Sequence, residues 1–227
     1  MKNLKHTLFI FLVSVFLFSC SDKGNMGNSG QNEIKENNFT TSTDAVNKGK
    51  ADLISILKNN KEFNLNIDAA ALERSNPESP ISVFDVNFER LLRADSATLA
   101  TVSEDHKKVQ TPLVDNSRVV TVISTSQNEK GWQLDEITNN VASADLTEIK
   151  SQFNNMNVPI SVFEVPNINA TIYEVNADGR KLYFTRYNGA SLRQPQSEDE
   201  IFKQIRADAQ VFQRQFGDLV QKGKLVK

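Results

Sequence analysis

The chain has 227 residues, with 26 basic and 28 acidic residues and a net charge of −2. This mild acidity argues against nucleic acid as a partner, because binding to phosphates needs clustered Lys and Arg. Residues with the common catalytic chemistries are scarce, since Cys20 is the only cysteine and His6 and His106 are the only histidines.

The first nineteen residues have the pattern of a secretory signal. Lys2 and Lys5 form a short basic start, and residues 8–18 then run apolar, broken only by Ser14. As a helix this run would cover about 16 Å, roughly half of the ~30 Å hydrocarbon core of a bilayer. The sequence therefore predicts a cleaved signal over residues 1–19 rather than a membrane span.

The signal closes on Leu17-Phe18-Ser19-Cys20, which resembles the lipobox of bacterial lipoprotein precursors. The resemblance covers these first twenty residues only. It implies cleavage just before Cys20, lipid such as palmitate on the Cys20 thiol, and more than one acyl chain, which holds a protein stably in a membrane. Ser21 after the cysteine, where an Asp often signals retention in the inner membrane, favours the outer membrane. The single acid Asp22 leaves open whether the protein faces the periplasm or the surface.

Cleavage of the signal would leave still fewer residues for catalysis or metal binding. Loss of residues 1–19 removes two basic residues and His6, which leaves 24 basic and 28 acidic residues and a net charge of −4. With lipid on Cys20, neither a Cys–His nucleophile nor a zinc site of Cys and His can be assembled. The sequence predicts no catalytic residue, no metal ligand and no cofactor.

The remaining chain is predicted to be α+β. Residues 20–42 are rich in Asn, Gly and Ser and are expected to form a disordered tether. Two related units, residues 43–142 and 143–227, are each expected to pack a helix on an antiparallel sheet. A single continuous sheet packed by three helices is the alternative.

Three helices are predicted from apolar periodicity and capping residues. The first covers residues 43–58 with Thr43 as N-cap, and the second covers residues 143–156 with Ser143 as N-cap. The third opens on a capping box at residues 197–200 and carries an apolar stripe. Phe212 and Phe216 on that stripe are expected to complete the core of the second unit, although a docking stripe is the alternative.

An internal repeat is the strongest signal within the folded part. Residues 80–86 return as residues 159–165 with six of seven positions identical, and Asp85 corresponds to Glu164. Each copy lies between a helix and a hairpin, at residues 119–137 and 171–186 respectively. This order predicts a duplication with residues 91–113 as an insertion, and chance similarity of two strands is the alternative.

Few side chains of the folded part are candidates for catalysis or for binding a ligand or partner. Asp85 and Glu164 could form a carboxylate pair of the glycosidase type, although two solvent-facing acids explain them as well. His106 is expected in a solvated loop and Trp132 in the core. Tyr183 and Tyr187 share one strand face, where they either bind a partner or lie beneath the third helix.

The residues thus favour a non-catalytic module of the cell envelope, held at the membrane through lipid on Cys20 and able to bind an envelope protein. One alternative is a carboxylate-based glycan hydrolase, which would need Asp85 and Glu164 within about 10 Å in a cleft. Another is a lipoprotein that binds a small solute in a pocket between the two units.

Overall fold

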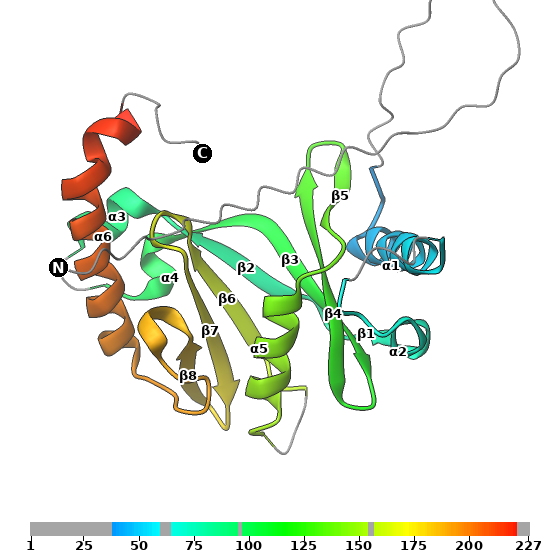
Figure 1. The fold of residues 1–227 in the computed structure, drawn as a ribbon. Helices are drawn as coiled ribbons and strands as arrows, with labels where there is room; N and C mark the ends of the chain where they lie inside the picture. The colour runs from blue at the N-terminus through cyan, green and yellow to red at the C-terminus, as the bar shows by residue number, and fades with distance from the viewer. Residues whose placement is uncertain (1–37, 60–64, 95–96, 154–156, 222–227) are drawn as a thin grey trace, which may run out of the picture. The chain divides into compact units, whose positions relative to one another are not determined.

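A computed structural model describes residues 38–59, 65–94, 97–153 and 157–221; residues 218–221 are described by their backbone alone. The predicted signal, Cys20 and the tether up to residue 37 lie outside the described residues, as does the predicted end of the second helix at Met156. The fold is α+β, and a helix follows the last strand of the sheet, as predicted (Figure 1).

All described strands belong to one sheet, in the order β5-β4-β3-β2-β6-β7-β8, with β1 paired to β3. The strands are β1 (Asn76–Pro77), β2 (Ile81–Val86), β3 (Ser103–Asp115), β4 (Arg118–Asn128), β5 (Gly131–Glu136), β6 (Ile160–Val165), β7 (Ala170–Ala177) and β8 (Arg180–Thr185). Every pairing is antiparallel except β2 with β6. The two predicted units are therefore two halves of one sheet.

The repeated segments meet at this parallel junction. β2 and β6 pair in register, so that Val83 lies beside Val162, Phe84 beside Phe163 and Asp85 beside Glu164. Val83 and Val162 pack into the same core cluster, and the two phenylalanine rings stack at a centroid distance of 5.3 Å on the other face. Equivalent residues thus stabilise the centre of the sheet as neighbours.

Helices cover both faces of the sheet. They are α1 (Ser42–Asn59), α2 (Ala69–Arg74), α3 (Phe88–Arg93), α4 (Leu99–Val102), α5 (Asn140–Lys150) and α6 (Glu198–Gln221). α5 lies in front of the sheet in Figure 1, where Leu146 and Ile149 pack against Val162 and Phe184. α6 packs on the opposite face of β6–β8 through residues including Ile201 and Ile205.

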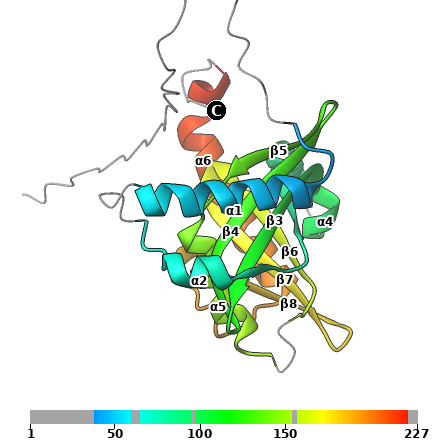
Figure 2. The same cartoon turned by 90° about the vertical axis from the view of Figure 1, so that its right-hand side faces the viewer.

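α1 and α2 cover the remaining part of the sheet. Figure 2 faces these two helices, of which α1 packs mainly against β4 and β5 and α2 against β3 and β4. Val46 and Leu53 of α1 and Leu72 of α2 are fully or almost fully buried against Leu113 and Ile123. This cluster gives the first half of the sheet its own apolar core.

The first two predicted helices begin one and three residues before their predicted starts, at Ser42 and Asn140. α1 is capped by Thr41 rather than Thr43, since the Thr41 hydroxyl accepts a hydrogen bond from the Asp44 N–H at 3.1 Å. α5 is capped by Asn139, whose Oδ1 accepts from the Ala142 N–H at 2.9 Å. Ser143, the predicted cap, lies inside α5 and donates to the Asn139 carbonyl. Asn is as good an N-cap as Ser, so the pattern allowed both positions.

The capping box at the start of α6 is confirmed. The Glu200 carboxylate accepts from the Ser197 N–H at 3.0 Å, and the Ser197 hydroxyl accepts from the Glu200 N–H at 3.3 Å. The helix continues through Gly217 to Gln221. Its apolar stripe is buried over its first half, whereas Phe216 is 38% exposed and does not reach the core.

The hairpin of β7 and β8 has the predicted register, with Val175 opposite Leu182 and Tyr173 opposite Phe184. Its turn residues Asp178 and Gly179 have φ values of 51° and 73°. Positive φ at both positions is the signature of a type I′ turn, which matches the twist of the flanking strands.

The first half departs most from prediction. Residues 91–113, predicted as an insertion, contain most of β3, the strand that joins β2 to β4 in the sheet. The chain is also ordered before Thr43, because Phe39 exchanges two backbone hydrogen bonds of 2.8 Å with Trp132 of the edge strand β5. Gly131 allows this approach, since a Cβ there would lie 2.7 Å from the Phe39 carbonyl oxygen.

A buried ion pair connects the two halves of the fold. Lys150 at the end of α5 pairs with Glu78, which precedes β2, and their side chains are 5% and 19% exposed. Glu78 also donates its backbone N–H to the Pro112 carbonyl of β3 at 2.9 Å. The pair thus connects the end of α5 with the segment that leads into β2, the strand of the first repeat copy.

Candidate functional site

A polar hollow of about 470 Å³ lies on the α5 face of the sheet, at the N-terminal end of α5. Both halves contribute to it, with β3 from the first half and α5, β6 and β7 from the second. Its lining residues are Gln110, Asn139, Val141, Ala142, Asp145, Glu164, Asn169, Thr171, Tyr173, Arg186 and Tyr187.

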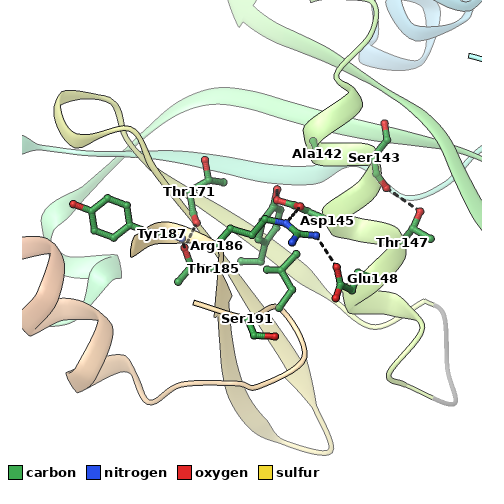
Figure 3. A network of polar contacts seen from close by, with 12 residues as sticks. Ala142, Ser143, Asp145, Thr147, Glu148, Thr171, Thr185, Arg186, Tyr187 and Ser191 are labelled. Atoms are coloured by element: carbon green, nitrogen blue, oxygen red, sulfur yellow. Dashed lines mark hydrogen bonds and ion pairs between the residues drawn. The ribbon is translucent and has the colours of Figure 1, made fainter. Parts of the chain in front are cut away.

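Arg186 and Asp145 form the charged wall of the hollow (Figure 3). The Arg186 side chain reaches from the end of β8 to α5, where its Nε donates to Asp145 at 2.6 Å and its Nη2 to Glu148 at 2.6 Å. Asp145 is only 4% exposed and also accepts from the Tyr173 hydroxyl at 3.1 Å. A buried carboxylate needs such partners, so the wall is held in one geometry.

The electrostatics of the wall follow from these contacts. The Asp145 hydrogen bond raises the pKa of Arg186, and burial together with the Asp145 charge raises the pKa of Tyr173 well above its usual value. Arg186 therefore stays a cation and Tyr173 a neutral donor throughout the range in which proteins are stable. Burial and a hydrogen bond to Asp208 raise the pKa of Tyr187 to about 12.

Gln110 lies at the β3 side of the hollow and has an unsatisfied group. The residue is 4% exposed, and its Oε1 has no hydrogen-bond partner among the described residues. A buried acceptor left unpaired costs about 1–3 kcal/mol relative to one that is satisfied. Native proteins rarely leave such groups unpaired, so Gln110 marks a place where a polar partner fits.

Glu164 lines the hollow from β6 and pairs with a lysine. The Lys108 ammonium donates to its carboxylate at 2.8 Å. Burial alone would lower the pKa of Lys108, but the hydrogen bond and charge of Glu164, with Asp85 and Asp135 nearby, raise it. Glu136 lies beside this pair. Partial burial of the Glu136 carboxyl group raises its pKa, although the residue as a whole is exposed.

The predicted carboxylate pair is thus brought together, since Asp85 and Glu164 are register partners on parallel strands. Their Cα atoms are separated by about one strand spacing of ~4.8 Å, and both side chains point to the same face. Only Glu164 lines the hollow. Asp85 instead lies 3.8 Å from Nε2 of His106, which is exposed on strand β3 rather than in the predicted loop.

The two tyrosines expected on an outer strand face lie beneath α6 or against it. Tyr183 is 2% exposed and donates to Glu174 at 2.8 Å. Tyr187 is half-buried and donates to Asp208 of α6 at 2.9 Å. The interpretation in which the third helix covers this face is therefore confirmed for Tyr183, and its ring is unavailable to a partner.

The other predicted aromatic positions are less buried than expected. Trp132 is half-buried on the edge strand β5, and it does not belong to the core clusters of the described residues. Phe212 is half-buried against Phe88, at a centroid distance of 5.6 Å, and contacts the exposed Phe216. The prediction that both phenylalanines complete the core is wrong for Phe216.

Sequence reasoning missed the hollow itself. Gln110 and Arg186 lie in strand or strand-end positions where an isolated polar residue has no motif around it. Gln110 and Thr111 are adjacent polar residues that the structure buries, but their burial is not visible in the sequence. A buried polar pair within a strand indicates either a partner or a site.

Two further findings concern metal binding and membrane-spanning helices. Within them, no group of three or more His, Cys, Asp or Glu side chains is arranged to hold a metal ion. No helix in the part of the chain that the structure describes has the length and hydrophobicity that crossing a bilayer requires.

Comparison with known proteins gives no relative. No protein-family model matches the chain, and neither curated proteins nor solved structures yield a match.

Proposed function

We propose that this protein is a lipid-anchored lipoprotein of the cell envelope whose folded domain binds a partner or ligand without chemical turnover. The anchor rests on Leu17-Phe18-Ser19-Cys20 after the short apolar run. In this proposal residues 1–19 are removed, Cys20 carries the lipid, and the protein is held in the outer membrane.

One observation carries the binding role: the polar hollow on the α5 face of the sheet. Its volume of about 470 Å³ lies within the roughly 300–1,000 Å³ typical of ligand sites. Its charged groups are held by one another, Asp145 by Arg186 and Glu164 by Lys108. A wall of groups fixed in this way presents a defined pattern of donors and acceptors, as a binding site requires.

A carboxylate-based glycan hydrolase is the second candidate, and the pairing of Asp85 with Glu164 favours it. Two properties weigh against it. Asp85 does not line the hollow, and Glu164 is already occupied by Lys108 at 2.8 Å. Release of reducing ends from a polysaccharide, abolished by Glu164→Gln, would favour the hydrolase over the binding module.

A cross-linking experiment on intact cells tests the proposed function. We expect the full-length protein to be captured with a stoichiometric envelope protein, and the Cys20→Ala variant to lose most of that capture because it lacks the lipid that holds the protein in the outer membrane. Equal capture by both proteins would contradict a role for the anchor. No partner at any cross-linker length would contradict an assembly role and leave small-ligand binding as the surviving form of the proposal.

A further inference from the structure

We infer that the hollow beside α5 binds a neutral, hydroxyl-rich ligand, such as one sugar unit of an envelope glycan. This inference rests on the proposed binding function and specifies its ligand class. It follows from the charge balance of the hollow, from the kinds of polar groups that line it, and from the unsatisfied Gln110.

The charge balance excludes ions as the favoured ligand. Each charged lining residue already has an opposite partner: Asp145 with Arg186 at 2.6 Å, and Glu164 with Lys108 at 2.8 Å. A charged ligand entering this space would be left without its own counter-charge, or would break one of these pairs. A neutral ligand avoids both costs.

The polar groups suit hydroxyls in particular. Asn169 and Gln110 bring amides, Thr171 brings a hydroxyl, and Glu164 brings a carboxylate. A hydroxyl donates one hydrogen bond and accepts two, so it can bridge a carboxylate and an amide within one site. Val141 (69% exposed) and the half-buried Tyr187 add apolar surface for the ring carbons.

Gln110 provides the independent indication of a ligand. Its side chain lines the hollow and is almost completely buried, yet Oε1 lacks a partner among the described residues. Oε1 is covered from solvent in the structure, so the side-chain amide has to turn toward the hollow for a ligand hydroxyl to supply the missing donor. Because Oε1 makes no hydrogen bond within the described residues, replacing the amide by an apolar group of the same size should affect the ligand and not the fold.

The test measures binding of matched monosaccharides to the full-length lipidated protein in lipid nanodiscs, by saturation-transfer NMR. Glucose and N-acetylglucosamine are the neutral probes, while glucuronate and glucosamine carry one negative and one positive charge. We expect binding of a neutral probe at millimolar concentration and at least about tenfold weaker binding of the charged analogues.

Gln110→Met keeps the size of the side chain and removes the amide. We expect it to weaken binding of the neutral probe about tenfold without lowering the melting temperature, whereas Gln127→Met, at an exposed position of β4, changes neither. Equal affinity for charged and neutral probes, unchanged binding in Gln110→Met, or no binding of any probe overturns the inference. A cross-linked partner with no sugar binding would leave the proposed function standing, and the absence of both would overturn both.

Discussion

Replacing Glu78 with alanine is expected to lower the free energy of unfolding by about 3–5 kcal/mol. Glu78 pairs with the Lys150 ammonium, and the Lys150 side chain is only 5% exposed. Removing one partner of a buried ion pair takes away the opposite charge beside the other in a medium of low dielectric constant, which is strongly destabilising. The free energy would be measured by urea unfolding of the full-length protein in a mild detergent.

Two control variants separate this effect from general damage. Glu89→Ala removes an acid from an exposed i,i+4 pair with Arg93, so it should cost about 0.5 kcal/mol or less. The double variant Glu78→Met/Lys150→Met should recover most of the lost stability, because well-packed apolar residues often replace a buried pair at little cost. A Glu78→Ala effect no larger than that of Glu89→Ala would show that the pair does not join the two halves.

Arg186→Met is expected to lower the free energy of unfolding by about 2–3 kcal/mol. It leaves the carboxylate of Asp145, whose side chain is 6% exposed, with the Tyr173 hydroxyl as the remaining side-chain hydrogen-bond donor among the described residues. Hydrogen bonds to charged groups contribute about 1.5–3 kcal/mol each, and the loss is larger when the acceptor stays buried. The effect is smaller than for Glu78 because the Arg186 side chain is itself half exposed.

Arg193→Met provides a matched control for the same measurement. Both arginines contact Glu148, Arg186 at 2.6 Å and Arg193 at 3.1 Å, but only Arg186 contacts Asp145. Arg193 is 79% exposed, so its removal should cost no more than about 0.5 kcal/mol. Similar losses in the two variants would place the stabilisation in Glu148 and contradict the role of Asp145.

Local sequence signals predicted the second half of the fold well. The β7–β8 register follows from Asp178-Gly179 and the alternation on both sides, and the start of α6 follows from the Ser197–Glu200 capping box. These features depend on residues close together in the chain, so their physics is visible without the rest of the fold.

The first half was harder because its key strand has no local pattern. β3 begins with polar and charged residues and gains its extended conformation from β2 on one side and β4 on the other. The repeat at residues 80–86 and 159–165 likewise predicted two strands but not their parallel, in-register pairing. Pairing between distant strands depends on tertiary packing rather than on the residues of either strand.

The hollow could not be predicted from the sequence for the same reason. Gln110 lies in β3, Glu164 lies in β6 and Arg186 follows β8, and no spacing along the chain links them. Of the paired carboxylates that the repeat did suggest, only Glu164 lines the hollow, while Asp85 faces His106. A site built from side chains of separate strands becomes visible only when the sheet is assembled.

The mass of the mature N-terminal peptide, obtained from protein extracted out of bacterial membranes, tests the lipid anchor of the proposed function most directly. We expect a chain that begins at Cys20 and carries diacylglyceryl lipid on its thiol, with an unprocessed and unlipidated chain in the Cys20→Ala variant. A mature chain with a free Cys20 thiol, or one that retains residues 1–19, would contradict the lipoprotein assignment.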